Sequence, residues 1–368
     1  MQSDAMGVNQ TLEVQRQRIA EARIAEAPLE PLRDGEVRVR VERFALTANN
    51  ITYGVIGEML GYWEFFPPPA DDAAAGWGRI PAMGWGEVVA SEADGIEPGG
   101  RYYGWYPMSR WCTMTATATQ AGFRDDGAHR SEHAPVYRAY LETSADPLHE
   151  PGADAEDRHA LLRGLFGTAY VADEFFAARD YFGASTVIVL SASSKTAIGF
   201  AQRAARRGLG EVVGLTSDRN REFVEGLGFY DRVLTYGAED ELTESDSVLI
   251  DMAGNGEILQ RVHTHLGDRL KHSMIVGMSH HDAPRGEVEG GPQPEMFFAP
   301  AEIKQLSDVL GREEFQRRLA EATGGLISAS ADWLTLERSS GSEQALDAYR
   351  SVLEGSTPPS VGRIVSLH

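Results

Sequence analysis

The chain has 368 residues, 42% of them hydrophobic, and a formal net charge of -21 at pH 7. This length suffices for two packed domains of about 100–200 residues each, and the negative charge disfavours nucleic acid and anionic membrane surfaces as main partners. A single cysteine, Cys112, excludes an intramolecular disulfide and a cysteine cluster for structural zinc. With neither a secretory signal pattern nor a run of roughly 18 apolar residues, the expected compartment is the cytoplasm.

The first third of the sequence has the pattern of short strands separated by turns. Apolar and polar side chains alternate over residues 35–42, a second strand fits residues 86–92, and the turn at 98–100 leads into a third strand at 101–106. Such strands, broken by Gly and Pro, are typical of a small barrel or sandwich. Residues 113–152 are polar and irregular, and the one element their pattern indicates is a strand or a helix around residues 137–141.

Near residue 157 the pattern changes to alternating helices and strands. Apolar residues first recur at helical spacing as far as residue 181. Strands are then expected at 186–190, 211–216, 232–235, 247–251 and 273–277, and helices at 197–207, 220–227 and 256–266. Near-continuous apolar strands between helices indicate a parallel sheet covered on both faces. Further helices are expected at 300–322 and 344–354, and a last strand at 362–367.

Residues 187–199, VIVLSASSKTAIG, stand where a dinucleotide-binding domain carries G-x-G-x-x-G, yet glycine comes only at their end. The side chains of 191–194 are small enough to admit a pyrophosphate, and their hydroxyls can add donors at the helix N-terminus. Ala197 can take the place of the third glycine. Lys195 opposes the helix dipole, which a bound anion would explain. The alternative is a packed strand–turn–helix that binds nothing.

The end of the next predicted strand favours NADPH over NADH. An NAD site normally carries an acidic residue there for the ribose diol. Here Thr216 and Ser217 occupy the positions expected to discriminate between the two cofactors. Arg219 and Arg221 follow, and arginine is geometrically suited to bind a 2′-phosphate. Asp218 argues for NADH unless it caps the following helix.

Segments along most of the chain match, in order, those of a known family. They are residues 31–42, 46–51, 80–89, 96–102, 225–234, 247–254, 274–279 and 345–367. Their succession resembles the medium-chain dehydrogenase/reductase superfamily, and within it the zinc-lacking branch of quinone oxidoreductases and enoyl reductases. The resemblance implies an α/β fold: a GroES-like β-barrel domain, residues 1–160 and 299–368, plus a Rossmann domain with a doubly wound parallel sheet, residues 161–298. It also implies a homodimer.

The resemblance implies an NADP(H) site in the second domain and a catalytic turn in the first. The cofactor-binding residues expected are Ser191, Ser193, Ser194, Lys195, Thr196, Thr216, Ser217, Arg219, Tyr236, Gly277, Met278 and Ser279. Residues 48–53 resemble the barrel-domain turn that faces the nicotinamide. Tyr53 is therefore the first candidate for a proton donor and Tyr62 the second, with Asn50 as an orienting group and water as the remaining alternative.

Two aromatic, proline-rich segments, 62–69 and 297–300, have the composition to line a pocket for an apolar or aromatic small molecule. Core packing or a subunit contact would explain them equally. His280, His281 and Asp282 are adjacent in the chain and therefore poorly placed to share one metal ion, so no metal site is predicted.

Together these patterns predict an NADPH-dependent, zinc-independent reductase that transfers hydride to an activated C=C bond, in an enone or enoyl compound, or to a quinone-like acceptor. The missing glycines motivate a different alternative. In that case the chain is a catalytically silent relative that binds a dinucleotide or has a structural role.

Overall fold

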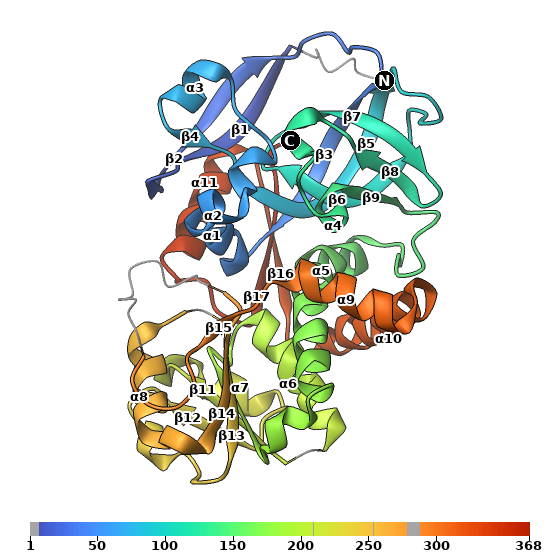
Figure 1. The fold of residues 1–368 in the computed structure, drawn as a ribbon. Coiled ribbons are helices and arrows are strands. Elements are labelled where there is room, and N and C mark those ends of the chain that lie inside the picture. The colour runs from blue at the N-terminus through green and yellow to red at the C-terminus, as the bar shows by residue number, and fades with distance from the viewer. Residues whose placement is uncertain (1–6, 209, 253, 278–287) are drawn as a thin grey trace. The chain divides into compact units, whose positions relative to one another are not determined.

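The computed structural model describes residues 7–208, 210–252, 254–277 and 288–368 (Figure 1). The chain divides into two compact units. Unit 1 consists of Met1–Leu161 and Thr335–His368, and unit 2 of Leu162–Leu334. Among the described residues, no helix has both the length and the apolar character needed to cross a membrane.

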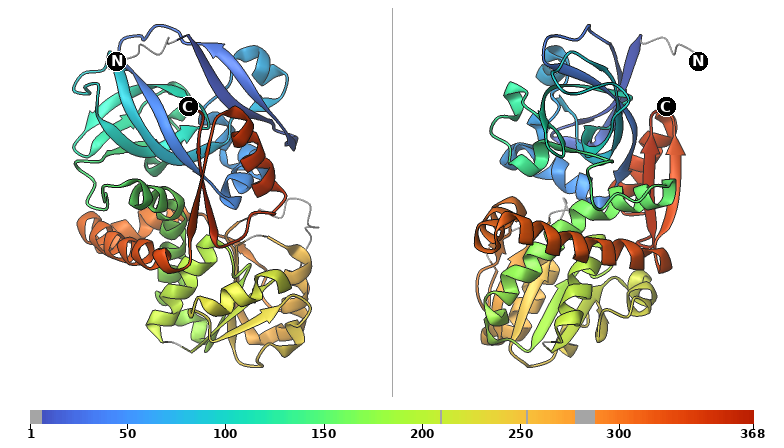
Figure 2. Two further views of the ribbon diagram at one scale, coloured as in Figure 1. Left: turned by 180° about the vertical axis from the view of Figure 1, so that it is seen from behind. Right: turned by 90° about the vertical axis from the view of Figure 1, so that its right-hand side faces the viewer.

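Six strands of unit 1 close into a barrel. In order of pairing they are β3 (Glu36–Leu46), β5 (Pro81–Ser91), β6 (Arg101–Pro107), β9 (Ala139–Glu142), β8 (Gly122–Asp125) and β7 (Trp111–Thr119). β7 pairs back with β3 and closes the ring. Side chains of β7 alternate between buried and exposed, as a barrel wall requires. The predicted GroES-like barrel is confirmed, and Figure 2 shows it from two further sides.

The segment 113–152 supplies much of this barrel wall, although its sequence pattern indicated an element only around residues 137–141, where α4 (Pro135–Arg138) ends and β9 begins. It contributes most of β7 and the whole of β8 and β9. β8 and β9 have four residues each, which is too short for an alternating pattern to stand out from the surrounding turns.

The other elements of unit 1 are an N-terminal hairpin, short helices and the returning tail. They are β1 (Val8–Gln15), β2 (Arg18–Pro28), β4 (Trp77–Gly78), α1 (Ala48–Val55), α2 (Gly57–Leu60), α3 (Ala70–Ala74), α4 (Pro135–Arg138), β16 (Thr335–Ser340), α11 (Ser342–Leu353) and β17 (Val361–Ser366). β17 pairs antiparallel with β3, so the tail returns to the barrel unit as predicted.

Unit 2 is built on a six-stranded parallel sheet in the order β12-β11-β10-β13-β14-β15. The strands are β10 (Thr186–Leu190), β11 (Glu211–Thr216), β12 (Arg232–Thr235), β13 (Ser247–Asp251), β14 (Leu270–Ile275) and β15 (Glu295–Met296). Numbered within the unit, this order is 3-2-1-4-5-6, the order of a Rossmann sheet. The predicted doubly wound fold is confirmed.

Helices cover both faces of this sheet. They are α5 (Ala153–Ala177, which begins in unit 1), α6 (Lys195–Arg207), α7 (Arg221–Gly226), α8 (Gly256–Leu266), α9 (Ala299–Leu310) and α10 (Arg312–Ala329). Val187 and Val189 of β10 belong to a core shared with α5, α6 and α10, whereas Ile188 and Leu190 belong to a second core shared with α8. Successive residues of the strand thus point into different cores.

The α9–α10 hairpin packs within unit 2. Phe315 and Leu326 of α10 are buried in the same core as β10, and Ile303 and Leu306 of α9 pack against it. The sequence-based boundary of the second domain lies at residue 298, and the contacts extend unit 2 to Leu334.

Candidate functional site

The turn between β10 and α6 adopts the backbone conformation that glycine usually supplies. Ser191 has a φ of 55°, in the left-handed region. An L-residue there is disfavoured by about 1–2 kcal/mol. Two backbone hydrogen bonds hold the turn: the N–H of Ala192 donates to the carbonyl of Leu215 at 3.0 Å, and the N–H of Ser194 donates to the carbonyl of Ser191 at 2.8 Å. The missing first glycine is therefore replaced by a serine held in the glycine conformation.

The first turn of α6 is capped and packed tightly. The hydroxyl of Ser194 accepts from the N–H of Ala197 at 3.2 Å, as an N-cap does. Ala197 is fully buried, and a Cβ on Gly199 would lie 2.9 Å from the Phe166 ring of α5. Ala197, at the place of the third glycine of the fingerprint, and Gly199 thus permit close packing of α6 on its neighbours.

Lys195 is the first residue of α6, and Thr196 follows it; both are half-buried. Burial lowers the pKa of the Lys195 ammonium to about 8. At pH 7 the group is still mostly protonated, so a positive charge stands at the N-terminus of the helix, where an anion rather than a cation is favoured. A phosphate group would relieve this unfavourable placement.

The end of β11 presents neutral hydroxyl groups. Thr216 is buried. The Ser217 hydroxyl oxygen is also buried, and it has no hydrogen-bond partner among the described residues, an arrangement that usually indicates an unfilled polar role. Arg219 and Asp218 are both exposed. The alternative role of Asp218 as a helix cap is wrong, because neither the 3-10 helix it begins nor α7 has a side-chain cap. Asp218 therefore still argues for NADH, against Thr216, Ser217 and Arg219.

Side chains at the carboxyl ends of neighbouring strands meet at the turn. The hydroxyl of Tyr236, which follows β12, lies 3.4 Å from the Ser191 hydroxyl. The amide of Asn220 donates to the Ser193 hydroxyl at 3.0 Å. Asn220 was not among the predicted site residues, because its position after β11 was the only feature of the sequence that indicated a role for it. This edge of a parallel sheet is where doubly wound folds bind ligands.

The remaining cofactor candidates lie at the end of β14. Gly277 is buried, two residues beyond the strand. Met278 and Ser279 lie outside the described residues, as do His280, His281 and Asp282. Within residues 7–208, 210–252, 254–277 and 288–368, no three His, Cys, Asp or Glu side chains are grouped so that they could hold a metal ion.

In unit 1, a capping box fixes the start of α1. The Asn50 side chain accepts from the Thr47 N–H at 2.8 Å, and its amide donates to the carbonyl of Pro81 at 2.9 Å. Asn50 is buried, with both ends of its amide engaged in these structural bonds. Asn49, which the sequence analysis did not select, instead donates to the Tyr53 hydroxyl.

Tyr53 and Tyr62 belong to an aromatic cluster formed by Tyr53, Tyr62, Phe65, Trp105 and Tyr137. The rings of Tyr53 and Tyr62 lie 4.6 Å apart, and the ring of Tyr53 lies 5.3 Å from that of Trp105. Burial raises the pKa of both phenols. The structure thus brings the two tyrosine candidates together, and both are neutral proton donors near pH 7.

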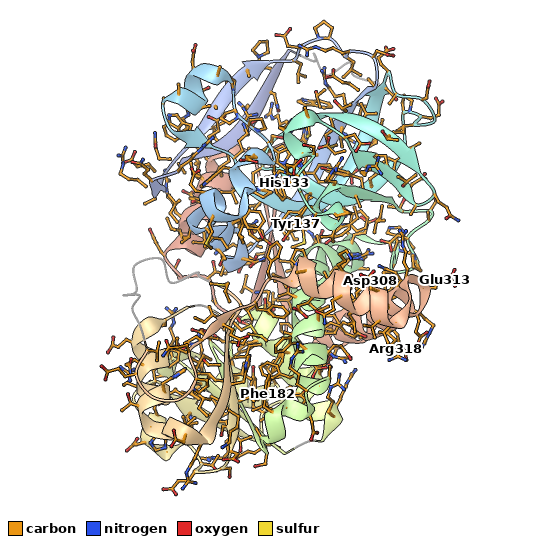
Figure 3. All side chains as sticks on the ribbon, in the orientation of Figure 1. His133, Tyr137, Phe182, Asp308, Glu313 and Arg318 are labelled. Atoms are coloured by element: carbon orange, nitrogen blue, oxygen red, sulfur yellow. The ribbon has the colours of Figure 1, made fainter. Side chains whose placement is uncertain are left out.

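The cluster also contains side chains that the sequence analysis did not select. Tyr137, labelled in Figure 3, comes from the short helix α4 between β8 and β9, and its hydroxyl lies 3.0 Å from that of Tyr62. Trp105 comes from β6. No spacing in the sequence connects residues 62, 105 and 137, so only the barrel closure could have shown that they meet.

A family model described as "Protein of unknown function (DUF2855)" matches residues 44–358. No curated protein matches the sequence.

Three solved structures similar to this chain are the following. CurA from Vibrio vulnificus has a TM-score of 0.58 at 14% identity, with 98% of this chain and 99% of that chain covered; its structure was also determined in complex with NADPH. The mycobacterial protein Rv1454c, complexed with NADPH, has a TM-score of 0.55 at 16% identity, covering 97% and 99%. The enoyl reductase CurK has a TM-score of 0.55 at 13% identity, covering 97% and 99%. The predicted medium-chain dehydrogenase/reductase resemblance is confirmed for the fold.

Proposed function

We propose that this chain, which belongs to the DUF2855 family of proteins of unknown function, is an NADPH-dependent oxidoreductase that reduces an activated C=C bond without zinc. The observation that carries the proposal is the turn at Ser191, whose φ of 55° reproduces a dinucleotide-binding turn without glycine. Its support from other proteins is the fold shared with CurA and Rv1454c, both crystallised with NADPH, and with the enoyl reductase CurK.

The residues of the turn fit a pyrophosphate. Ser191, Ser193, Ser194 and Thr196 have small or hydroxyl-bearing side chains, and the N-terminus of α6 offers backbone N–H groups. Lys195 supplies the positive charge. Because the whole protein carries a net charge of -21, this local cation has to act against the overall field.

The preference for NADPH is assigned to the end of β11. Thr216 and Ser217 are neutral, and the buried Ser217 hydroxyl has no partner among the described residues, so it is available to the ribose. Arg219 is exposed and able to pair with a 2′-phosphate. Tyr236, held beside Ser191, is assigned to the adenosine side, and Gly277, Met278 and Ser279 to the nicotinamide side by their place in the fold.

NADPH, when bound, supplies a hydride to the β-carbon of the acceptor. The chain supplies the proton. As the π-electron pair of the C=C bond becomes a new C–H bond at the α-carbon, the O–H bond of Tyr62 breaks and its proton moves to that carbon. The Tyr62 phenolate then regains a proton that comes from water.

Tyr62 is favoured over Tyr53 as the donor because of their hydrogen-bond partners. The hydroxyl of Tyr62 is bonded to another phenol, Tyr137, which is half-buried and whose own O–H can pass on a proton. The hydroxyl of Tyr53 accepts from the amide of Asn49, which cannot relay one at neutral pH. Asn50 acts indirectly, by fixing the helix that carries Tyr53.

The first test is NADPH binding, measured by fluorescence and by thermal shift. Wild-type protein and Ser191→Gly are expected to bind, because glycine adopts the same φ without strain. Ser191→Val is expected to lose binding, because a β-branched residue is poorly accommodated at positive φ. Far-ultraviolet circular dichroism checks that the Val variant is folded. Absence of NADPH binding by the wild type would overturn the proposal.

Turnover is then measured with three acceptors: an enone, an enoyl thioester and a quinone. NADPH oxidation with the first two is the expected result, and reaction with the quinone alone would replace the substrate class. Binding without turnover of any acceptor would instead identify a catalytically silent dinucleotide-binding relative.

A further inference from the structure

We propose that Tyr137 is a positioning residue for the proton donor Tyr62, donating a hydrogen bond to the Tyr62 oxygen so that the Tyr62 proton is left for transfer. This inference rests on the proposed function. It gives a role to helix α4, between β8 and β9, which carries Tyr137.

The geometry of the pair supports a direct hydrogen bond. The two hydroxyl oxygens are 3.0 Å apart, and the rings meet edge to face with centroids 5.8 Å apart. The Tyr137 ring is held on two other sides, with Trp105 and Phe65 both at 5.2 Å between centroids. A ring fixed in this way keeps its hydroxyl on the Tyr62 oxygen.

The direction of the bond during proton transfer follows from the chemistry of two phenols. Either hydroxyl can donate in the resting pair. While the Tyr62 O–H donates to the acceptor, the Tyr62 oxygen can only accept within the pair, so Tyr137 is the donor. Burial raises the pKa of both phenols, so both carry their protons near pH 7.

A buried arginine joins the two segments that carry these tyrosines. The side chain of Arg130 is fully buried and donates to the carbonyl of Phe65 at 3.1 Å and to the carbonyl of Tyr137. Its guanidinium lies 4.3 Å from the centroid of the Phe65 ring. One side chain therefore sets the spacing between the segment of Tyr62 and the segment of Tyr137, and Asp125 lies 3.8 Å away as its counter-ion.

The same pair provides a route for reprotonation. Tyr62 is buried, whereas Tyr137 is half-buried and is the more exposed of the two. After the Tyr62 proton has moved to the substrate, the Tyr137 proton passes to the Tyr62 oxygen. A water molecule then restores the Tyr137 proton, so that the net proton comes from solvent and the reducing electrons come from NADPH.

The test compares Tyr137→Phe with wild type, using full-length protein loaded with NADPH. The ring and its contacts are kept and only the hydroxyl is lost. We expect kcat to fall by roughly 10–100-fold, because a charge-assisted hydrogen bond to the developing phenolate is removed, while KM changes little. Tyr349→Phe is the matched control, since it removes another buried hydroxyl bond of unit 1, to the carbonyl of Ile19, and should leave kcat unchanged.

A second measurement does not depend on turnover. With tyrosine labelled by ¹³C at Cζ, the Tyr62 resonance is identified by its loss in Tyr62→Phe. It should shift in Tyr137→Phe and stay in place in Tyr349→Phe. An unshifted resonance, or an unchanged kcat in Tyr137→Phe, would overturn the positioning role. If the Tyr62 resonance shifts in Tyr137→Phe but the wild-type protein turns over none of the acceptors, the hydrogen bond is retained and the proposed function is overturned.

Discussion

The turn between β10 and α6 in unit 2 and the aromatic cluster of unit 1 are built in opposite ways. The turn consists of residues consecutive in the chain, and its shape comes from backbone: Ser191 at positive φ and the capped start of α6. The cluster brings together side chains from three separate segments, through residues such as Tyr62, Trp105 and Tyr137. The turn therefore depends on the backbone conformation at one position, whereas the cluster depends on individual rings and hydroxyls.

This contrast predicts that changes in the cluster affect turnover and changes in the turn affect binding. The largest effect is expected for Tyr62→Phe, which should lower kcat by about 10²–10⁴-fold, the usual contribution of a general acid, with the Kd for NADPH unchanged. Steady-state kinetics and fluorescence titration measure the two quantities. Tyr53→Phe is the comparison variant, and a larger loss of kcat there would transfer the donor role to Tyr53.

The next effect concerns the choice between the two cofactors. Arg219→Ala should weaken NADPH binding by roughly 10–100-fold, the range of one charge-assisted hydrogen bond, and leave NADH binding nearly unchanged. The control is Arg221→Ala, two residues away, where the arginine is exposed and paired with Glu225 at 2.8 Å. Equal losses in both variants would show a general charge effect and not recognition of the 2′-phosphate.

The smallest effect is a pH dependence of binding. The Lys195 pKa of about 8 means that the ammonium is already charged below pH 8, and that binding above pH 8 requires uptake of a proton. Affinity for both NADPH and NADH should therefore fall with rising pH, by up to about tenfold per pH unit.

Lys195→Met should remove the dependence of affinity on pH. Arg219→Ala should keep it, because Lys195 and its contact with the pyrophosphate are unchanged in that variant. The measurement is the Kd of wild type and both variants between about pH 7 and pH 9.5, a range that extends roughly one unit or more on either side of the pKa. A slope unchanged in Lys195→Met would assign the titration to another group.

The same contrast explains what could be predicted from the sequence. The alternation of strands and helices after residue 157, the replaced turn at 187–199 and the returning tail are all local patterns, and the structure has each of them. Local patterns report the hydrogen bonding and burial of one element at a time.

The cluster could be predicted only in part. Tyr53 and Tyr62 were selected through the resemblance of residues 48–53 and the neighbouring segment, but Tyr137 lies in a stretch whose four-residue strands leave no readable period. Its approach to Tyr62 depends on the closure of the barrel and on the buried Arg130, which are long-range features. The role first expected for Asn50 shows the same limit, since its engagement with Pro81 of β5 is also long-range.

The positive φ of Ser191 has a consequence for how nucleotide-binding chains are searched for. A pattern that demands glycine tests for the residue that reaches this conformation most easily, and it passes over chains in which neighbouring hydrogen bonds hold a serine there instead. A search by backbone handedness at the first turn after the first strand of a parallel sheet would retrieve both kinds.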